Sequence, residues 1–180
     1  MYWLLIFGIG LLIQSCSPSY LHPLDGGPEL DSAWVSKHVQ PIQLEGSDFV
    51  DLQFLKEEIG NRRIVALGEQ THKDGKSFEL RGRLVEFLME EMDFEVVLFE
   101  SGMFDIYHAA ELAKESGKVS DVTKALYWFW KDAEQHERLF AYWQERMDAG
   151  KALEFGGFDT KLTSAYGRSQ GNYTKQLKAL

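Results

Sequence analysis

Hydrophobic and polar residues are arranged along this chain in blocks that predict strands separated by helices. Short, nearly continuous apolar runs predict strands over 63–67, 95–99 and 153–158. Apolar residues at helical spacing predict helices over 47–60, 77–92, 106–116 and 122–149. Apolar runs without alternation are typical of strands that are buried on both faces. Because strands that alternate with helices form βαβ units, we expect an α/β fold with a parallel sheet and flanking helices.

The predicted helix Ser77–Met92 has an apolar stripe and a polar face when its residues are placed at about 100° intervals. The stripe comprises Phe78, Leu84, Val85, Leu88 and Met92, and the opposite face comprises Glu79, Arg83, Glu86 and Glu90. Because Glu79 lies on the solvated face, we expect it to pair with Arg83, four residues later. A charged residue within the apolar stripe, by contrast, needs a separate explanation.

Arg81 is such a residue, because it lies near the centre of the apolar stripe and one turn from the start of the helix. A buried guanidinium loses much of its hydration energy, and carboxylate contacts are the usual way to offset that loss. We therefore expect Arg81 to pair with Glu69 and Glu100 at the sheet edge. In the alternative interpretation, Arg81 extends past the end of the helix into water.

Acidic residues follow all three predicted strands. These residues are Glu69, Glu100 and Asp159, and His72 lies three residues after Glu69. In parallel α/β folds ligands bind at the carboxyl ends of the strands, so these side chains are expected to meet at one edge of the sheet. Carboxylates beside a histidine are a common arrangement of a general base and the groups that orient it. The alternative is that the acidic residues only mark where the chain leaves the core.

Metal and serine-hydrolase chemistry fit the Glu69 and His72 pair less well. A di-iron bundle needs this spacing on a helix and in two copies, whereas here it follows a strand and occurs once. The His-Glu-x-x-His zinc motif is absent, and one cysteine cannot form a thiolate zinc site. The Gly-x-Ser-x-Gly motif of serine hydrolases is also absent. We therefore predict no metal site.

Length and composition are those of one globular domain. The chain has 180 residues, of which 44% are hydrophobic and 26% are charged. Its formal net charge is −9 and its pI is near 5.0. Because an acidic surface repels phosphate, the chain is not expected to bind nucleic acid.

The N-terminus carries an uncharged apolar run of 12 residues, Tyr2–Ile13, which is followed by Cys16. The run is short for a membrane span but has the length of a secretory signal. With Cys16 it resembles a bacterial lipoprotein signal over 1–16, which implies lipidation of Cys16 and membrane anchoring at the outer membrane or periplasmic side. Proline and glycine predict a tether over 17–30, and the folded domain would occupy 31–180. The alternative is a lone cysteine in an ordinary apolar terminus.

The segment Arg63–Gly102, which reads RIVALGEQTHKDGKSFELRGRLVEFLMEEMDFEVVLFESG, resembles the erythromycin esterase family. That family has a strand, then Gly-Glu-x-Thr/Ser-His, then a helix with Glu-Leu-Arg, then a strand that ends in Phe-Glu-x-Gly. The later segment LEFGGFDTK, Leu153–Lys161, is similar to the Gly-Phe-Asp segment of the family. The resemblance covers residues from Leu52 to Lys161.

The resemblance implies a hydrolase that opens a macrolide lactone or another carboxylic ester, with a small-molecule ester as partner and with no cofactor. By matching position, His72 is the general base. The other matching catalytic residues are Glu69, Arg81 and Glu100, and Asp159 is expected to contact substrate. Family members are longer and carry a second essential histidine in their later part. The chain is therefore expected to be truncated relative to the family and to correspond to its N-terminal portion.

Two other interpretations of the function remain. The resemblance also extends to a fold group with haem-binding lipoproteins, and the aromatic segment Ala125–Trp143 would suit a ligand or haem. However, Leu126, Phe129 and Trp130 fall at helical spacing, which is more typical of a core than of a cofactor site. In the third interpretation the chain is an inactive fragment that does not fold.

Overall fold

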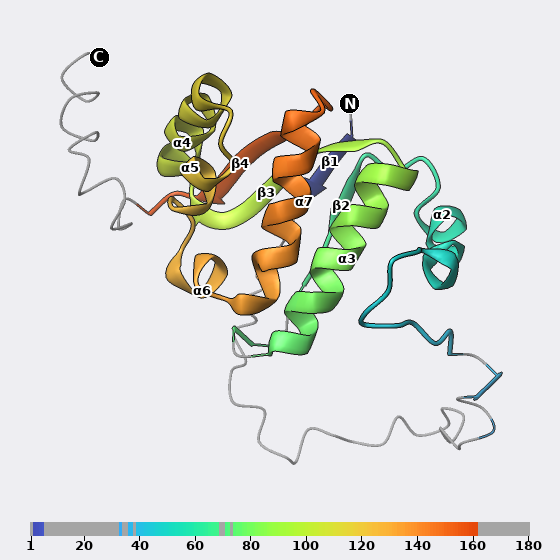
Figure 1. The fold of residues 1–180 in the computed structure, drawn as a ribbon. Helices are drawn as coiled ribbons and strands as arrows, with labels where there is room; N and C mark the ends of the chain where they lie inside the picture. The colour runs from blue at the N-terminus through green and yellow to red at the C-terminus, as the bar shows by residue number, and fades with distance from the viewer. Residues whose placement is uncertain are drawn as a thin grey trace.

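The sheet of this protein consists of four parallel strands. The computed structural model describes residues 39–68, 71–72 and 74–161, the strand Tyr2–Leu5, and residues 33, 36 and 37. The strands are β1 (Tyr2–Leu5), β2 (Ile64–Ala66), β3 (Phe94–Gly102) and β4 (Glu154–Asp159). Their spatial order is β2-β1-β3-β4, and every neighbouring pair is parallel (Figure 1). The predicted parallel α/β fold is thereby confirmed.

Helices pack against this sheet and against one another. Their bounds are η2 (Val50–Leu52), α2 (Phe54–Ile59), α3 (Gly75–Glu91), α4 (Met103–Ser116), α5 (Ser120–Thr123), α6 (Trp128–Lys131), η3 (Glu134–His136) and α7 (Glu137–Asp148). Figure 1 shows α3 and α7 side by side in front of the sheet, while α4 packs beside β4. The largest fully buried side chains of the described core are Trp130, Trp143, Phe87, Phe94 and Phe99.

Most of the predicted helices begin and end close to their expected positions, for identifiable local reasons. Gly60 follows α2 with a φ of 57°, a left-handed conformation that glycine adopts without strain. Asp74 caps α3, because its carboxylate accepts hydrogen bonds from the backbone N–H and the hydroxyl of Ser77. The helix α3 therefore begins at Gly75, two residues earlier than predicted.

The single helix predicted over 122–149 is wrong, because this region contains the end of α5 and then the separate helices α6, η3 and α7. The backbone is extended at Tyr127, with a ψ of 151°, and again at Ala133, with a ψ of 116°. These two breaks separate α5, α6 and α7. They place Trp130 in the core, with 1% of its surface exposed, while Trp128 on the same short helix is 68% exposed.

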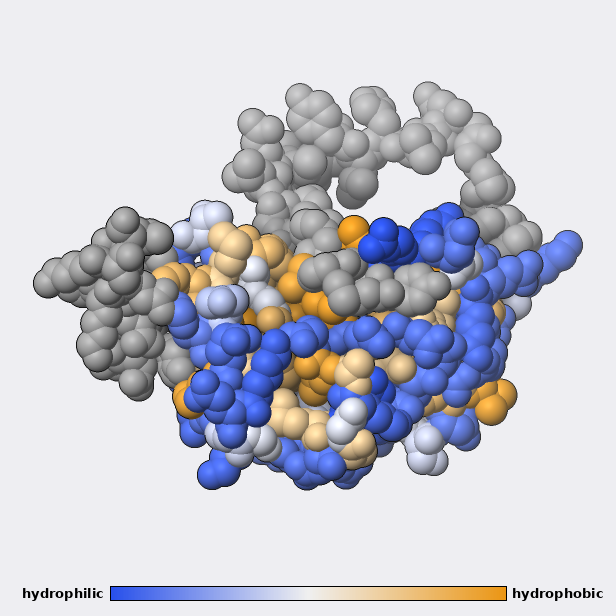
Figure 2. Space-filling model, turned by 90° about the horizontal axis from the view of Figure 1, so that it is seen from above, coloured by the Kyte–Doolittle hydropathy of each residue, from blue (hydrophilic) through white to orange (hydrophobic). Residues whose placement is uncertain are grey.

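The prediction that all the strands are buried on both faces is also wrong for β2. This strand forms one edge of the sheet, and Ile64 is 51% exposed. Apolar surface is exposed elsewhere as well, and Figure 2 shows hydrophobic residues in the middle of one face, between bands of hydrophilic residues. The described part of the chain thus leaves some apolar surface in contact with solvent.

The N-terminal segment that resembles a signal contributes β1, the strand between β2 and β3. Only its first residues fall within the described part of the chain. Cys16 and the predicted tether over 17–30 lie outside the described residues. Among the described residues, the helices are too short or too polar to cross a membrane.

Candidate functional site

His72 lies in the loop between β2 and α3, at the carboxyl end of the sheet. Its imidazole stacks on the ring of Phe129, with centroids 4.1 Å apart and planes inclined by 21°. It also meets the Trp130 ring edge-on, with centroids 6.3 Å apart. His72 is exposed to solvent, so it is within reach of a ligand. Glu69, its predicted partner, lies outside the described residues.

Arg81 is buried within α3, with only 5% of its surface exposed, so the interpretation in which it extends into water is wrong. Its guanidinium carbon lies 4.6 Å from the Phe78 ring centroid and 4.8 Å from that of Trp130. Its Nε donates a hydrogen bond to the carbonyl oxygen of Ser77 at 3.3 Å. Aromatic faces attract a cation electrostatically, and the attraction grows when water is excluded. These rings therefore help to hold the buried charge in place.

Trp130 connects three of the predicted site residues. Its ring contacts both His72 and Arg81, and its indole Nε1 donates a hydrogen bond to the carbonyl oxygen of Glu100 at 3.1 Å. The prediction that Trp130 belongs to the core is confirmed. Its contacts with His72 and Arg81 were not predicted, because helical spacing distinguishes buried from exposed positions but does not show which residues a buried ring contacts.

The end of β3 is shaped by an irregular pairing with β4. The register between the two strands shifts between Phe99 and Gly102, where Glu100 lies. Gly157 on β4 makes room for this irregularity, since a Cβ there would lie 2.5 Å from the Ser101 carbonyl oxygen and 2.9 Å from Gly102. The buried Ser101 hydroxyl in turn accepts a hydrogen bond from the backbone N–H of Tyr127 at 3.0 Å. The irregular strand end thereby anchors the start of α6.

Asp159, the last residue of β4, is brought to the same end of the sheet. One carboxylate oxygen accepts a hydrogen bond from the Tyr127 hydroxyl at 3.0 Å, and the other accepts one from the Lys161 backbone N–H at 2.9 Å. Burial acts to raise the pKa of Asp159, but these hydrogen bonds outweigh it and lower the pKa below its ordinary value. Tyr127 was not predicted as a site residue, because one tyrosine in an aromatic segment carries no distinctive spacing.

A pocket of about 210 Å³ opens beside His72. Its walls include the rings of Phe78, Trp128 and Phe129, and polar groups of Asp132 and Gln135 also line it. The site thus combines an imidazole, a buried guanidinium and an aromatic pocket. Among the described residues, no group of three or more His, Cys, Asp or Glu side chains is placed to hold a metal ion.

Two residues assigned to the solvated face of α3, Arg83 and Glu86, are in fact buried. Arg83 forms a salt bridge and a second hydrogen bond with Asp51, and Glu86 accepts two hydrogen bonds from Arg138 at 3.1 and 2.7 Å. The predicted pairing of Glu79 with Arg83 is therefore wrong. Glu79 instead forms a salt bridge of 2.7 Å with Lys76, which lies three residues earlier and reaches it directly.

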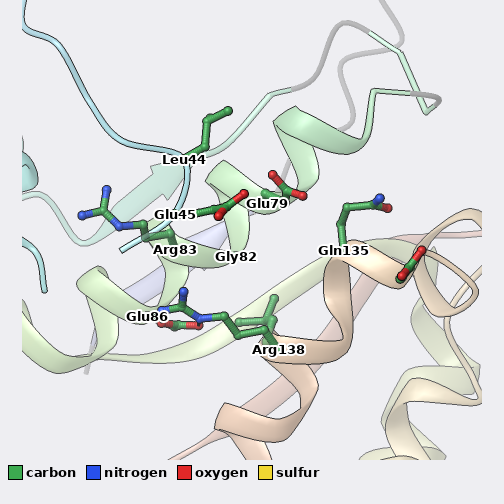
Figure 3. Close-up of a pocket in the computed structure, with 10 residues that line it drawn as sticks. Leu44, Glu45, Glu79, Gly82, Arg83, Glu86, Gln135 and Arg138 are labelled. Atoms are coloured by element: carbon green, nitrogen blue, oxygen red, sulfur yellow. Dashed lines mark hydrogen bonds and ion pairs between the residues drawn. The ribbon is translucent and has the colours of Figure 1, made fainter. Parts of the chain in front are cut away.

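These ion pairs lie at a second pocket of about 220 Å³, between α3 and the start of α7. Figure 3 shows Glu86 beside Arg138 and Glu79 above Gly82 in this pocket. Its two arginines are already engaged by Asp51 and Glu86. The ion pairs thus stabilise the packing of α3 against its neighbours and are not part of the predicted site.

Comparison with known proteins found sequence relatives, although no protein-family model matches the chain. A Bacillus subtilis (strain 168) protein named "Putative hydrolase YbfO" is 32% identical over 126 residues, which are 70% of this chain and 28% of the relative. Erythromycin esterase type II of Escherichia coli is 39% identical over 72 residues, which are 38% of this chain and 17% of that protein. The chain therefore spans less than a third of the length of either relative.

Solved structures with a similar fold were found as well. The crystal structure of a Bacillus cereus protein matches with a TM-score of 0.64 and 22% identity, over 82% of this chain and 36% of that chain. A protein described as a succinoglycan biosynthesis protein matches with a TM-score of 0.61 and 26% identity, over 69% of this chain and 32% of that chain. The structural matches show the same α/β fold, and the sequence relatives support the resemblance to the erythromycin esterase family that the motifs predict.

Proposed function

We propose that this chain hydrolyses a carboxylic ester, with His72 as the general base that activates water. The observation that carries the proposal is that His72 and Arg81 both contact the ring of Trp130, near the carboxyl end of the sheet. The similarity to a protein named as a hydrolase and to an erythromycin esterase supports it. A macrolide lactone is one such ester, because a lactone is a cyclic ester.

The reaction requires one proton to move twice. The imidazole of His72 takes a proton from water while the water oxygen attacks the carbonyl carbon and forms a tetrahedral intermediate. The bond between the acyl carbon and the alcohol oxygen then breaks, and the departing oxygen takes the proton back from the imidazolium. The products are a carboxylic acid and an alcohol, so the mass gained equals one water. Neither a metal nor a redox partner enters this balance.

Arg81 and Glu100 would act beside the base. A guanidinium in a largely apolar setting can stabilise the negative charge that develops on the carbonyl oxygen, because charges interact more strongly where water is excluded. A carboxylate such as that of Glu100 or Glu69 can orient the imidazole and stabilise its protonated form. Asp159, held by the hydroxyl of Tyr127, is the proposed substrate contact at the end of β4.

Binding of haem or another ligand without catalysis is not favoured as an alternative. The aromatic segment that suggested it is largely used in packing, since Leu126, Trp130 and Trp143 are buried in the core. Trp130 and Phe129 also contact His72, so the imidazole is already stacked against protein rings. The pocket that His72 lines has a volume of about 210 Å³.

The test is hydrolysis by the full purified chain of a macrolide lactone and of a simple ester, followed as the gain of one water by mass spectrometry. We expect His72→Ala to lower kcat/KM by about 10²- to 10⁴-fold, the usual contribution of a general base. His108→Ala is the matched control, because His108 lies on α4 and contacts Phe104 and Tyr107 of the same helix. Equal rates for the wild type and His72→Ala, or no hydrolysis of either ester, would overturn the proposal.

A further inference from the structure

We propose that the aromatic pocket beside His72 binds a planar, uncharged ring in the substrate, and that the ester group attached to this ring is thereby placed at the imidazole. The aromatic pocket is the space lined by Phe78, Trp128, Phe129 and His72, with Asp132 and Gln135 at its polar side. This inference rests on the proposed function, because it assigns a substrate class to the same site. Size, ring arrangement and charge each support it.

The size of the aromatic pocket limits what it holds. Sites that enclose a whole drug-sized ligand have volumes of roughly 300–1,000 Å³. The pocket beside His72, with about 210 Å³, is smaller than that range. It therefore fits one ring of a substrate, while the remainder of the molecule extends past His72 or into solvent.

The rings around the pocket are arranged for stacking. Phe129 uses one face to stack on His72, and Trp128 meets Phe129 edge-on, with centroids 5.7 Å apart and planes at 87°. Trp128 is 68% exposed, although a tryptophan exposes costly apolar surface to water. The exposed indole of Trp128 offers a flat face to a planar ring beside the candidate base. A ring stacked on that face would bury apolar surface that is otherwise in contact with water, which favours binding.

Charge favours an uncharged ring over an anionic one. The carboxylate of Asp132 lines the pocket, and its side chain is 64% exposed. Its nearest cation is Lys131, with the two charged atoms 3.9 Å apart, at the outer limit of a salt bridge. The chain as a whole carries a net charge of −9. Asp132 would therefore repel a ring that bears a carboxylate or a phosphate.

Gly75 and Gln135 set one boundary of the pocket. A Cβ on Gly75 would lie 3.0 Å from both the amide carbon and Nε2 of Gln135, which is closer than ordinary van der Waals contact. The Gln135 side chain therefore lies directly over the first residue of α3. An alanine at position 75 would push this flexible amide aside, so Gly75→Ala should change the shape of the ring site without removing any aromatic wall.

The first experiment measures binding without catalysis. The probe is N-benzylacetamide, an unreactive amide that has the shape of benzyl acetate, and its saturated control is N-(cyclohexylmethyl)acetamide. With the full chain, we expect the benzyl probe to bind about tenfold more tightly than the control, the value of a good aromatic contact. We expect Trp128→Ala to remove this preference and Trp128→Phe to retain it. Equal affinity of the two probes, or binding unaffected by Trp128→Ala, would overturn the ring site.

The second experiment separates the ring site from the proposed reaction. With benzyl acetate as substrate, Trp128→Ala should raise KM about tenfold and leave kcat nearly unchanged, because stacking acts equally in the ground state and the transition state. His72→Ala should lower kcat and still bind the benzyl probe. Probe binding without any hydrolysis would uphold the ring site and overturn the esterase proposal. Hydrolysis with no preference for benzyl acetate over cyclohexylmethyl acetate would uphold the esterase proposal and overturn the ring site.

Discussion

The guanidinium carbon of Arg81 lies 4.8 Å from the centroid of the Trp130 ring, and the same ring meets His72 edge-on. Arg81 lies on α3, Trp130 on α6, and His72 in the loop after β2. The buried Trp130 ring therefore contacts both the candidate base, His72, and the candidate oxyanion-binding group, Arg81. The three residues come from three separate segments of the chain. Substitutions at these positions should affect catalysis and stability in distinguishable ways.

Replacement of Arg81 by methionine should reduce catalysis more than it reduces stability. Methionine fills a similar volume and packs well against the rings of Phe78 and Trp130, but it carries no charge. We expect kcat/KM to fall by about 10²-fold or more, since a lost charge at the reacting oxygen usually costs that much. Arg138→Met is the control, because the Arg138 side chain is 53% exposed and lies on α7. Steady-state kinetics and thermal unfolding measure both effects, and equal activity losses in the two variants would contradict the prediction.

Trp130→Phe should destabilise the protein more than Trp143→Phe does. Both indoles are fully buried, but Trp130 Nε1 donates to the Glu100 carbonyl, whereas Trp143 Nε1 has no hydrogen-bond partner among the described residues. Loss of the Trp130 donor removes this hydrogen bond, and a typical hydrogen bond contributes about 0.5–1.5 kcal/mol beyond the packing loss that both variants share. Chemical denaturation gives the two free energies of unfolding. Equal destabilisation would show that the hydrogen bond to Glu100 contributes little.

The strands β2, β3 and β4 and the helix α3 could be predicted from the sequence because each of them carries its own local signal. Apolar runs marked β2, β3 and β4, and the helical repeat marked α3 within two residues of its start. The burial of Arg81 was predictable for the same reason, since a charge in the apolar stripe of a helix is visible from a few residues of spacing. Such signals need no knowledge of distant contacts.

Features that depend on distant segments could not be predicted in the same way. The spacing of α3 placed Arg83 and Glu86 on its solvated face. In the structure Arg83 pairs with Asp51, 32 positions away in the sequence, and Glu86 pairs with Arg138, 52 positions away. The irregular end of β3 depends on Gly157, and Tyr127 gains its role only from Asp159 on β4. The position of β1 depends on pairing with two strands that lie far along the chain.

The salt bridge between Arg83 and Asp51 should make stability depend on pH in the acidic range. The hydrogen bond from Arg83 lowers the pKa of Asp51 well below its ordinary value of 3.8. A carboxyl whose pKa is lowered by folding stabilises the folded state above its unfolded-state pKa, and that stabilisation is lost as the pH falls toward the folded-state pKa. We therefore expect the wild type to exceed Asp51→Asn in free energy of unfolding at pH 6 and to lose this advantage below about pH 4.

Denaturant titrations of both proteins between pH 2 and pH 7 test this prediction. Asp48→Asn is the control, since Asp48 is nearby but its carboxylate accepts a backbone N–H of Val50 and not the Arg83 guanidinium. The difference between wild type and Asp48→Asn should vary less across this range. A difference between wild type and Asp51→Asn that stays constant down to pH 2 would contradict the assigned role of Arg83.

Substitution of alanine for Gly157 and for Gly82 should change the stability of the protein in opposite directions. A Cβ at Gly157 would lie 2.5 Å from the Ser101 carbonyl oxygen, and backbone atoms of a paired strand cannot move aside cheaply. We expect Gly157→Ala to destabilise the protein by about 1–3 kcal/mol. Gly82 lies inside α3, and its nearest contact would be the Leu139 Cβ at 3.7 Å, an ordinary distance. Gly82→Ala should therefore stabilise the protein by about 0.5–1 kcal/mol. Thermal unfolding measures both variants, and a change in stability of the same sign in both would contradict the prediction.

The strand β1 should be necessary for a stable sheet. Leu4 pairs with Val65 of β2 on one side and with Val97 of β3 on the other, so β1 fills the space between two strands that do not pair with each other. Proline at position 4 removes a backbone donor from the centre of the sheet, where proline is not tolerated. We expect Leu4→Pro to lower the thermal unfolding midpoint, and a chain that begins at Cys16, as lipoprotein processing would leave it, to lose at least as much stability. If both variants unfold at the wild-type temperature, β1 does not stabilise the sheet. The first 16 residues would then be needed only as the signal that their sequence resembles.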